Sequence, residues 1–333
     1  VIPISAFNME GIDEMIERIN NIIVAYTKDN QPVYARVFHL ENSIRKLMER
    51  VFKPNGVFSL NNNLCLMHGG PFANIAHGCN TIIALNTALK YGKYVITEAG
   101  FGSDLGMEKF IDIVGQQYMY PDCVVIACSL RSIIQHSNKT GNEIEDIKLG
   151  LTNLQQHINN IKAFGVNFVV AINKFTNDSE ESINFLSNWL NEQNIPFALC
   201  DGFNLGAAGA VDLAKIVIDE SNKPCTIKPI YKVTDTLENK IKSIVNRAYG
   251  LHNIVYLDQA KEKLVKFNNL PYYVCMAKTP LSLSTDPKNL IYNPEDEIVI
   301  QDIIIANGAQ LIIPICQGIF RMPGLPKQPN ASK

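Results

Sequence analysis

The sequence predicts an α/β protein, because short apolar runs alternate with glycine turns and helical segments. One stretch shows this alternation twice: the apolar runs 64–67 and 94–96 are each followed by a glycine turn and a helical segment, the second ending near Ile113. That order predicts two parallel strands joined by a helix. The runs 123–128 and 166–172 are apolar throughout, as strands of a buried parallel sheet are. We therefore expect a mostly parallel sheet flanked by helices.

Composition places the chain among ordinary globular proteins. Its 333 residues are many for one core and suggest two or three domains. Hydrophobic residues make up 47% and charged residues 19% of the chain, and the mean hydropathy is close to zero. The net charge of −2 gives no electrostatic reason to expect nucleic acid or an anionic membrane as a partner. No apolar run reaches the roughly 18 residues that a membrane helix needs.

The eight cysteines lie singly in the sequence, without a C-x-x-C pair or a zinc-ligand spacing. This pattern favours reduced thiols in the cytoplasm or, in a eukaryote, in the mitochondrial matrix. The chain begins at Val1, without a methionine or a signal-peptide pattern, so we expect it to be a segment of a longer protein.

The remaining elements follow from the same patterns of apolar spacing, caps and turns. Before the central stretch we expect a helix over 11–21, a strand over 22–26, a helix over 40–51 and a turn at 54–56. After it we expect a helix over 153–163 and a second helix that is capped by Asp178 or Ser179 and ends at Leu190. A strand over 197–199 and a helix over 211–220 follow. A polar segment with two prolines at 221–229 predicts a linker. Beyond it we expect helices over 237–249 and 257–267 and strands over 272–277, 298–304 and 310–315.

Two glycine turns are the first candidate binding features. The first glycine turn contains Gly69, Gly70 and Pro71, and the second contains Gly100 and Gly102. At the carboxyl end of a strand and the start of a helix, such turns leave room for a ligand, and free backbone N–H groups favour anions. A tight strand-to-helix connection without a ligand explains each turn equally well. The spacing G-x-G-x-x-x-G does not match a dinucleotide-binding fingerprint.

Polar residues beside the turns have structural and functional interpretations. Ser103 or Asp104 is placed to cap the following helix. Glu98 is either a surface carboxylate or a group that accepts a hydrogen bond from a ligand or orients Lys109. His68 and His77 are nine residues apart, which is not a metal-ligand spacing, and each is more typical of a core or capping histidine than of a base.

Five segments of this sequence form specific motifs. They are HGGPFANIAHGCN (68–80), TEAGFGSDLGMEKF (97–110), VVAINKF (169–175), MAKT (276–279) and MPGLPK (322–327). Together they resemble formate–tetrahydrofolate ligase. The resemblance extends over nearly the whole chain. It implies a P-loop NTPase-like plan with smaller α/β and α+β domains, ATP with Mg²⁺ and a monovalent cation as cofactors, and a homotetramer. The family's P-loop belongs upstream of Val1, and no G-x-x-x-x-G-K-[ST] occurs in the 333 residues.

The implied reaction joins formate to tetrahydrofolate in two steps. ATP phosphorylates formate, and N10 of tetrahydrofolate attacks the resulting formyl phosphate. The resemblance assigns no catalytic residue and no metal ligand to this chain. It does imply a nucleotide- and substrate-binding wall, made of His68, Gly69, Gly70, Pro71, Phe72, Asn74, His77, Glu98, Gly100 and Gly102. It also implies a folate site at Phe175, Leu199 and Phe203, in which two aromatic rings hold the pterin.

Several positions depart from the family pattern. Phe203 stands where the family has tryptophan, Ile134 where it has lysine, and Val114-Gly115-Gln116 where it has K-C-R. The loop 205–209 also lacks a lysine and a glutamate of the family. Each charge-assisted contact is worth about 1.5–3 kcal/mol, so their loss favours an alternative, a non-catalytic homologue that serves as a binding or assembly subunit. Lys278 matches the family, and we expect a structural or subunit-contact role for it.

The resemblance also suggests domain boundaries. Residues 1–155 would be the remainder of a large nucleotide-binding α/β domain, 156–228 a second α/β domain with the folate clamp, and 229–333 a small mixed α+β domain.

Overall fold

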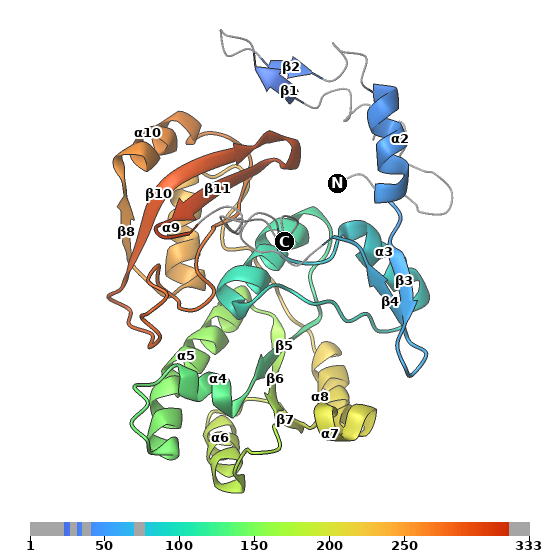
Figure 1. Cartoon of the computed structure of the whole chain (residues 1–333), viewed down its shortest axis with the longest axis vertical. Helices are drawn as coiled ribbons and strands as arrows, with labels where there is room; N and C mark the ends of the chain where they lie inside the picture. The colour runs from blue at the N-terminus through green and yellow to red at the C-terminus, as the bar shows by residue number, and fades with distance from the viewer. Residues whose placement is uncertain (1–22, 27–31, 35–40, 70–76, 320–333) are drawn as a thin grey trace, which may run out of the picture.

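The computed structural model describes residues 23–26, 32–34, 41–69 and 77–319 (Figure 1). Two larger sheets, one of three strands and one of four, are accompanied by two short antiparallel pairs. The first short pair is β1 (Ile23–Tyr26) with β2 (Pro32–Tyr34), followed by helix α2 (Glu41–Val51). None of the helices within the described ranges is both long and apolar enough to cross a membrane.

The predicted pair of parallel strands in the central stretch is wrong. Strand β4 (Leu64–Met67) pairs antiparallel with β3 (Asn55–Phe58), a strand that lies where a turn was expected. A tight turn at 59–63 joins the two strands, so β4 finds its partner next to it in sequence. The run 94–96 forms no strand, and Ile96 is 96% exposed. Helix α3 (Ile82–Tyr91) lies between them, capped by the Thr81 hydroxyl.

The three-stranded sheet confirms the parallel arrangement expected from the apolar runs. Its order is β5-β6-β7, and both pairs are parallel. The strands are β5 (Cys123–Cys128), β6 (Asn167–Asn173) and β7 (Phe197–Cys200). The helices around it are α4 (Leu130–Gln135), α5 (Glu143–Phe164), α6 (Glu180–Glu192), α7 (Gly202–Leu205) and α8 (Val211–Ser221). A 3-10 turn (Gly206–Ala210) separates the last two helices.

Apolar faces and polar caps explain these helices. Helices α5 and α6 bury leucine and isoleucine side chains in one core with β6, and the single tryptophan, Trp189, packs at its margin. Ser179, one of two residues expected to cap α6, accepts a hydrogen bond from the backbone N–H of Ser182. Gly165, with φ of 75°, ends α5 in the left-handed conformation that glycine adopts without strain.

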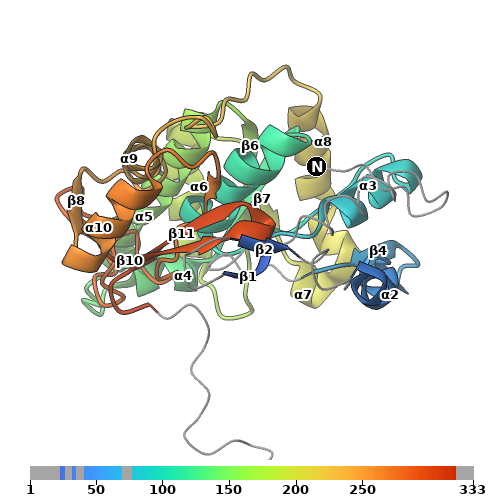
Figure 2. The ribbon, with the colours of Figure 1, turned by 90° about the horizontal axis from the view of Figure 1, so that it is seen from above.

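The four-stranded sheet is mixed and curls around its own core (Figures 1 and 2). Its order is β8-β10-β11-β9, with an antiparallel pair in the middle and parallel strands at both edges. The strands are β8 (Asn253–Tyr256), β9 (Tyr273–Val274), β10 (Glu297–Ala306) and β11 (Leu311–Cys316). Helices α9 (Leu237–Ala248) and α10 (Asp258–Phe267) pack against it, and a 3-10 turn (Asn307–Ala309) joins its central strands. No strand was predicted at the position of β8. A strand was predicted over 272–277, where β9 has only two residues.

Two π-helical segments lie between α5 and β9, and all their residues except Gly102 are buried. They are η2 (Gly102–Met107) and η3 (Phe110–Gly115). The expected cap at Ser103 or Asp104 is wrong, because Phe101 occupies the cap position and makes no side-chain bond. Both polar side chains point into the protein, where tertiary partners replace the local cap.

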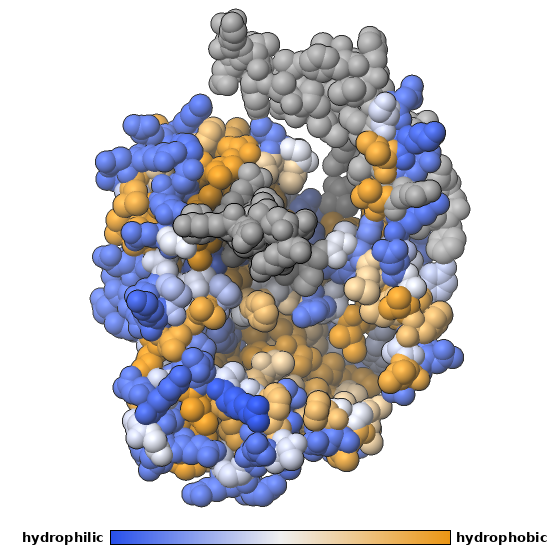
Figure 3. Space-filling view, viewed as in Figure 1, coloured by the Kyte–Doolittle hydropathy of each residue, from blue (hydrophilic) through white to orange (hydrophobic). Residues whose placement is uncertain are grey.

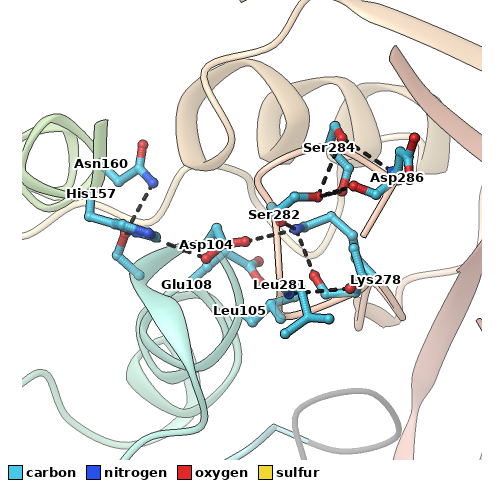
Figure 4. Close-up of polar contacts among 12 residues, drawn as sticks. Asp104, Leu105, Glu108, His157, Asn160, Lys278, Leu281, Ser282, Ser284 and Asp286 are labelled. Atoms are coloured by element: carbon cyan, nitrogen blue, oxygen red, sulfur yellow. Dashed lines mark hydrogen bonds and ion pairs between the residues drawn. The ribbon is translucent and has the colours of Figure 1, made fainter. Parts of the chain in front are cut away.

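Asp104 connects three parts of the chain (Figure 4). Its carboxylate lies 3.0 Å from the Lys278 ammonium, and both side chains are buried. Lys278 also donates to the carbonyl oxygens of Thr279 (2.9 Å) and Ser282. On the other side, Ser103 bonds to His157 Nδ1 at 2.8 Å and accepts from Asn160 at 3.0 Å. Helix α5, η2 and the segment after β9 are thereby held together.

Two more carboxylates lie deeper in the same region. Glu108 is fully buried with Lys109 at 3.8 Å, and neither of its carboxylate oxygens takes a hydrogen bond from the described residues. Burial raises the pKa of Glu108 to about 7, against the attraction of Lys109. Burial, followed by the charge of Glu108, also raises the pKa of Asp112, although its Oδ1 accepts from the Ile230 N–H at 2.8 Å. Near pH 7 this region therefore retains protons that the unfolded chain would release.

This burial predicts a pH dependence of stability. Glu108 has a higher pKa in the folded than in the unfolded chain, so its contribution is present below about pH 4.5 and is lost as the pH rises through about 7. We expect Glu108→Gln, which stays neutral, to raise the Tm at pH 8 by about 2–4 °C, the shift for about 1 kcal/mol. Thermal unfolding followed by circular dichroism at pH 5 and pH 8 measures this. An equal effect of the substitution at both pH values would contradict the raised pKa.

A second prediction concerns the close packing of η2 on the second glycine turn. A Cβ atom at Gly106 would lie 1.9 Å from the carbonyl oxygen of Gly100, so the turn would have to move. We expect Gly106→Ala to destabilise the chain by roughly 1–3 kcal/mol in denaturant titrations. Gly308→Ala is the matched control, because no atom lies within 4 Å of its added Cβ. Similar denaturation midpoints for the two variants would show that the contact between residues 106 and 100 does not exclude a side chain at 106.

Candidate functional site

His68, at the first glycine turn, is held by the protein on both sides of its ring. Its Nδ1 lies 2.7 Å from the Thr81 hydroxyl and its Nε2 bonds to the carbonyl oxygen of Val51. Its backbone is fixed as well: the N–H donates to Asn80 and the carbonyl accepts from Thr81. These contacts use both ring nitrogens, so the histidine orients the turn. Gly69 has φ of 80°, which only glycine adopts at low cost.

His77 lies beside a buried cysteine. Its Nδ1 accepts from the Cys79 N–H at 3.3 Å and is 3.1 Å from the Cys79 sulfur. Burial lowers the pKa of His77 and raises that of Cys79 to about 12, so both groups are neutral near pH 7. A protonated thiol is a poor nucleophile, and this pair is therefore suited to packing. Gly70, Pro71, Phe72 and Asn74, also expected at this site, lie outside the described residues.

The two glycine turns are linked through residues 77–81. Gly100 donates its N–H to the carbonyl oxygen of Gly78 at 2.6 Å, and Cys79 and Ala99 form an antiparallel bridge. The same short segment holds His68 through Asn80 and Thr81. Glu98 is exposed next to this bridge, whereas Lys109 is buried and forms its ion pair with Glu108. Gly102 has φ of 75° and begins η2.

The expected folate residues follow two neighbouring parallel strands. Phe175 comes after β6, and Phe203 lies in α7, directly after β7. Residues 173 and 200 pair at the ends of these strands, and Lys174 donates its N–H to the Cys200 carbonyl at 2.9 Å. The carboxyl edge of a parallel sheet is where α/β proteins bind ligands. The two phenylalanines therefore lie on adjacent loops at that edge.

Local hydrogen bonds shape each loop. Asp178 accepts from the Phe175 N–H at 2.8 Å, and Asp201 accepts from the Asn204 side chain at 2.7 Å. The Thr176 hydroxyl lies 3.4 Å from the Asn204 side-chain oxygen, which brings the loops together. Phe203 is 83% exposed, Leu199 is 38% exposed, and Phe175 is half-buried. Figure 3 shows apolar surface around a hollow on this face of the molecule.

Sequence reasoning missed one member of this region. The guanidinium carbon of Arg131, in α4, lies 4.4 Å from the centroid of the Phe175 ring. The sequence analysis assigned no role to Arg131, which lies three residues before Ile134. A stack between loops 44 residues apart leaves no pattern in the sequence, so only the topology of the sheet could have indicated it.

Three of the positions that lack the family's cations, 114–116, lie in packed surroundings. Val114 and Gly115 are buried, and a Cβ atom at Gly115 would lie 2.3 Å from the Tyr120 ring. The Gln116 amide donates to the carbonyl oxygens of Asp112 and Tyr231. A cation at Val114 would have to be buried in this structure, which is costly without a partner. Within the described ranges, no cluster of three histidine, cysteine or acidic residues could hold a metal ion.

Comparison with known proteins identifies the family of this chain. Residues 4–333 match the family model of formate–tetrahydrofolate ligase. The formate–tetrahydrofolate ligase of Acholeplasma laidlawii is 42% identical over 326 residues, which cover 96% of this chain and 62% of the relative. That of Staphylococcus aureus strain NCTC 8325 is 39% identical over 330 residues, with 96% and 60% covered. The chain thus spans less than two thirds of the length of these relatives, and it belongs to the formate–tetrahydrofolate ligase family.

Proposed function

We propose that this chain is the tetrahydrofolate-binding part of a formate–tetrahydrofolate ligase, which makes 10-formyltetrahydrofolate from formate, tetrahydrofolate and ATP. The observation that carries the proposal is the position of Phe175 and Phe203 on adjacent loops at the carboxyl edge of β6 and β7. In this proposal the pterin ring stacks between the two phenyl rings, and Leu199 adds apolar contact beneath it.

The chemistry requires positioning more than a reactive side chain. ATP transfers its terminal phosphoryl group to formate, and N10 of tetrahydrofolate then attacks the carbonyl carbon of formyl phosphate as phosphate leaves. No protein nucleophile enters either step. A clamp that fixes the pterin also fixes N10, and such positioning lowers the barrier by removing entropy in advance. The transferred phosphoryl group needs positive charge around it, which this chain would share with the rest of a complete ligase.

For the nucleotide and formate, we propose the surface formed by the two glycine turns. Its residues are His68, Gly69, Gly70, Pro71, Phe72, Asn74, His77, Glu98, Gly100 and Gly102. The hydrogen bonds through residues 77–81 support a single wall, because they fix one turn against the other. His68 and His77 act here by shaping the backbone, since their ring contacts are made within the chain.

Metal ions, assembly and location complete the proposal. We expect Mg²⁺ to be held by the phosphates of ATP. The monovalent cation stays a prediction from the family resemblance. A homotetramer in the cytoplasm stays a prediction from the family resemblance.

A second candidate is a catalytically inactive homologue that acts as a binding or assembly subunit. The specific observation in its favour is the neutral, closely packed surroundings of Val114, Gly115 and Gln116. A loop at 206–209 without charged residues is consistent with it as well. Formate- and folate-dependent ADP release by the full-length protein distinguishes the two candidates, because only the ligase would show it.

The folate clamp predicts a gain of affinity on restoring the larger ring. Phe203→Trp should tighten tetrahydrofolate binding by about 0.5–1.5 kcal/mol, roughly 2- to 10-fold, because indole offers more stacking area. Isothermal titration calorimetry measures the Kd. Phe58→Trp, at another exposed phenylalanine in β3, is the matched control and should have no effect. Unchanged or weaker binding by Phe203→Trp would contradict the clamp.

A second prediction concerns turnover by the chain itself. Residues 1–333 contain no G-x-x-x-x-G-K-[ST] motif to hold the phosphates of ATP. We expect this chain to bind tetrahydrofolate but to release no ADP above background with all three substrates present. ADP is measured by a coupled assay, with the Staphylococcus aureus ligase as positive control. ADP release that requires both formate and tetrahydrofolate would refute this prediction.

A further inference from the structure

Arg131 lies next to the proposed folate clamp. It follows β5 as Phe175 follows β6 and Phe203 follows β7, and these strands are neighbours in the sheet. The three residues therefore occupy successive loops along one edge. The guanidinium carbon lies 4.4 Å from the centroid of the Phe175 ring, within the range of a cation–π contact. Arg131 thus lies over one face of the Phe175 ring. In the proposed clamp the pterin stacks on the opposite face.

The guanidinium has hydrogen-bonding capacity to spare. Arg131 is exposed, and its N–H groups make no hydrogen bond or ion pair with any residue that the structure describes. Nearby cations differ in this respect: Lys174 pairs with Glu180 at 3.3 Å, and Lys278 pairs with Asp104. Five N–H donors in a planar fork fit a carboxylate through two parallel bonds. The Phe175 ring holds the plane of the fork, which reduces the entropy lost on binding.

We propose that Arg131 binds a glutamate carboxylate of tetrahydrofolate, an assignment that rests on the proposed function. The pterin is uncharged and suits the open face of Phe175, whereas the other end of the molecule carries two carboxylates. A folate that bends around the edge of the Phe175 ring presents its anionic end to the guanidinium. Arg131 is then the residue that distinguishes a folate from a simple pterin.

The test compares tetrahydrofolate with its dimethyl ester, in which methyl groups remove the charge of both glutamate carboxylates. The proteins are the wild-type chain, Arg131→Met and Arg131→Lys. Lys266→Met is the matched control, because it also removes a cation from a phenyl ring, that of Phe267 at 5.5 Å, but in α10. Melting curves establish that each variant is folded, and calorimetry gives each Kd.

We expect Arg131→Met to weaken tetrahydrofolate binding at least tenfold and to change ester binding less than twofold. Arg131→Lys should fall between, since it keeps the charge but not the fork, and Lys266→Met should match the wild type. An equal loss for both ligands, or no loss for either, would overturn the carboxylate assignment while the clamp remains. If the wild-type chain binds neither ligand, the proposed function fails and this inference fails with it.

Discussion

The buried ion pair of Asp104 and Lys278 is the contact on which the arrangement of this chain depends. It joins η2, which begins at the second glycine turn, to the segment that follows β9. Strand β9 is an edge strand of the four-stranded sheet. A buried charge that loses its partner costs roughly 3–5 kcal/mol, so neither residue can be changed alone without a large penalty. The hydrogen bonds of Ser103 to α5 extend this connection toward the three-stranded sheet. The position of the glycine turns is thereby set by tertiary contacts.

Much of the fold could be predicted from local patterns. The strands β5, β6 and β7 are visible as apolar runs, and Ser179 is visible as a cap. The predictions that were wrong depended on which strands pair and which side chains meet in the folded chain. An apolar run at 64–67 does not reveal whether it pairs with a neighbour in sequence or with a distant strand, and β3 was the neighbour. Ser103 and Asp104 have the chemistry of helix caps, but buried partners on α5 and after β9 satisfy them instead.

The candidate site likewise contains residues that the sequence indicated and one that it did not. Phe175 and Phe203 could be proposed from the sequence, because each follows an apolar strand. Phe175 also lies in a motif of the family, and Phe203 stands where the family has tryptophan. Arg131 could not be proposed, because its contact with Phe175 depends on which strands are adjacent. The neutral residues at 114–116 appeared to be a loss of charge in a binding site, whereas the structure buries Val114 and Gly115, the latter against Tyr120, and bonds Gln116 to the Tyr231 carbonyl. A substitution that looks functional in the sequence can thus be required by packing.

The chain has a single tryptophan, so tryptophan fluorescence reports on one place in the fold. Trp189 lies in α6 and packs at the margin of the core below the three-stranded sheet, while the aromatic residues along the sheet edge are phenylalanines. Fluorescence excited at wavelengths that only tryptophan absorbs therefore originates in α6, and not from the rings between which a pterin would stack. The native chain can report loosening of α6 by its fluorescence, but the rings at 175 and 203 contribute nothing to that signal.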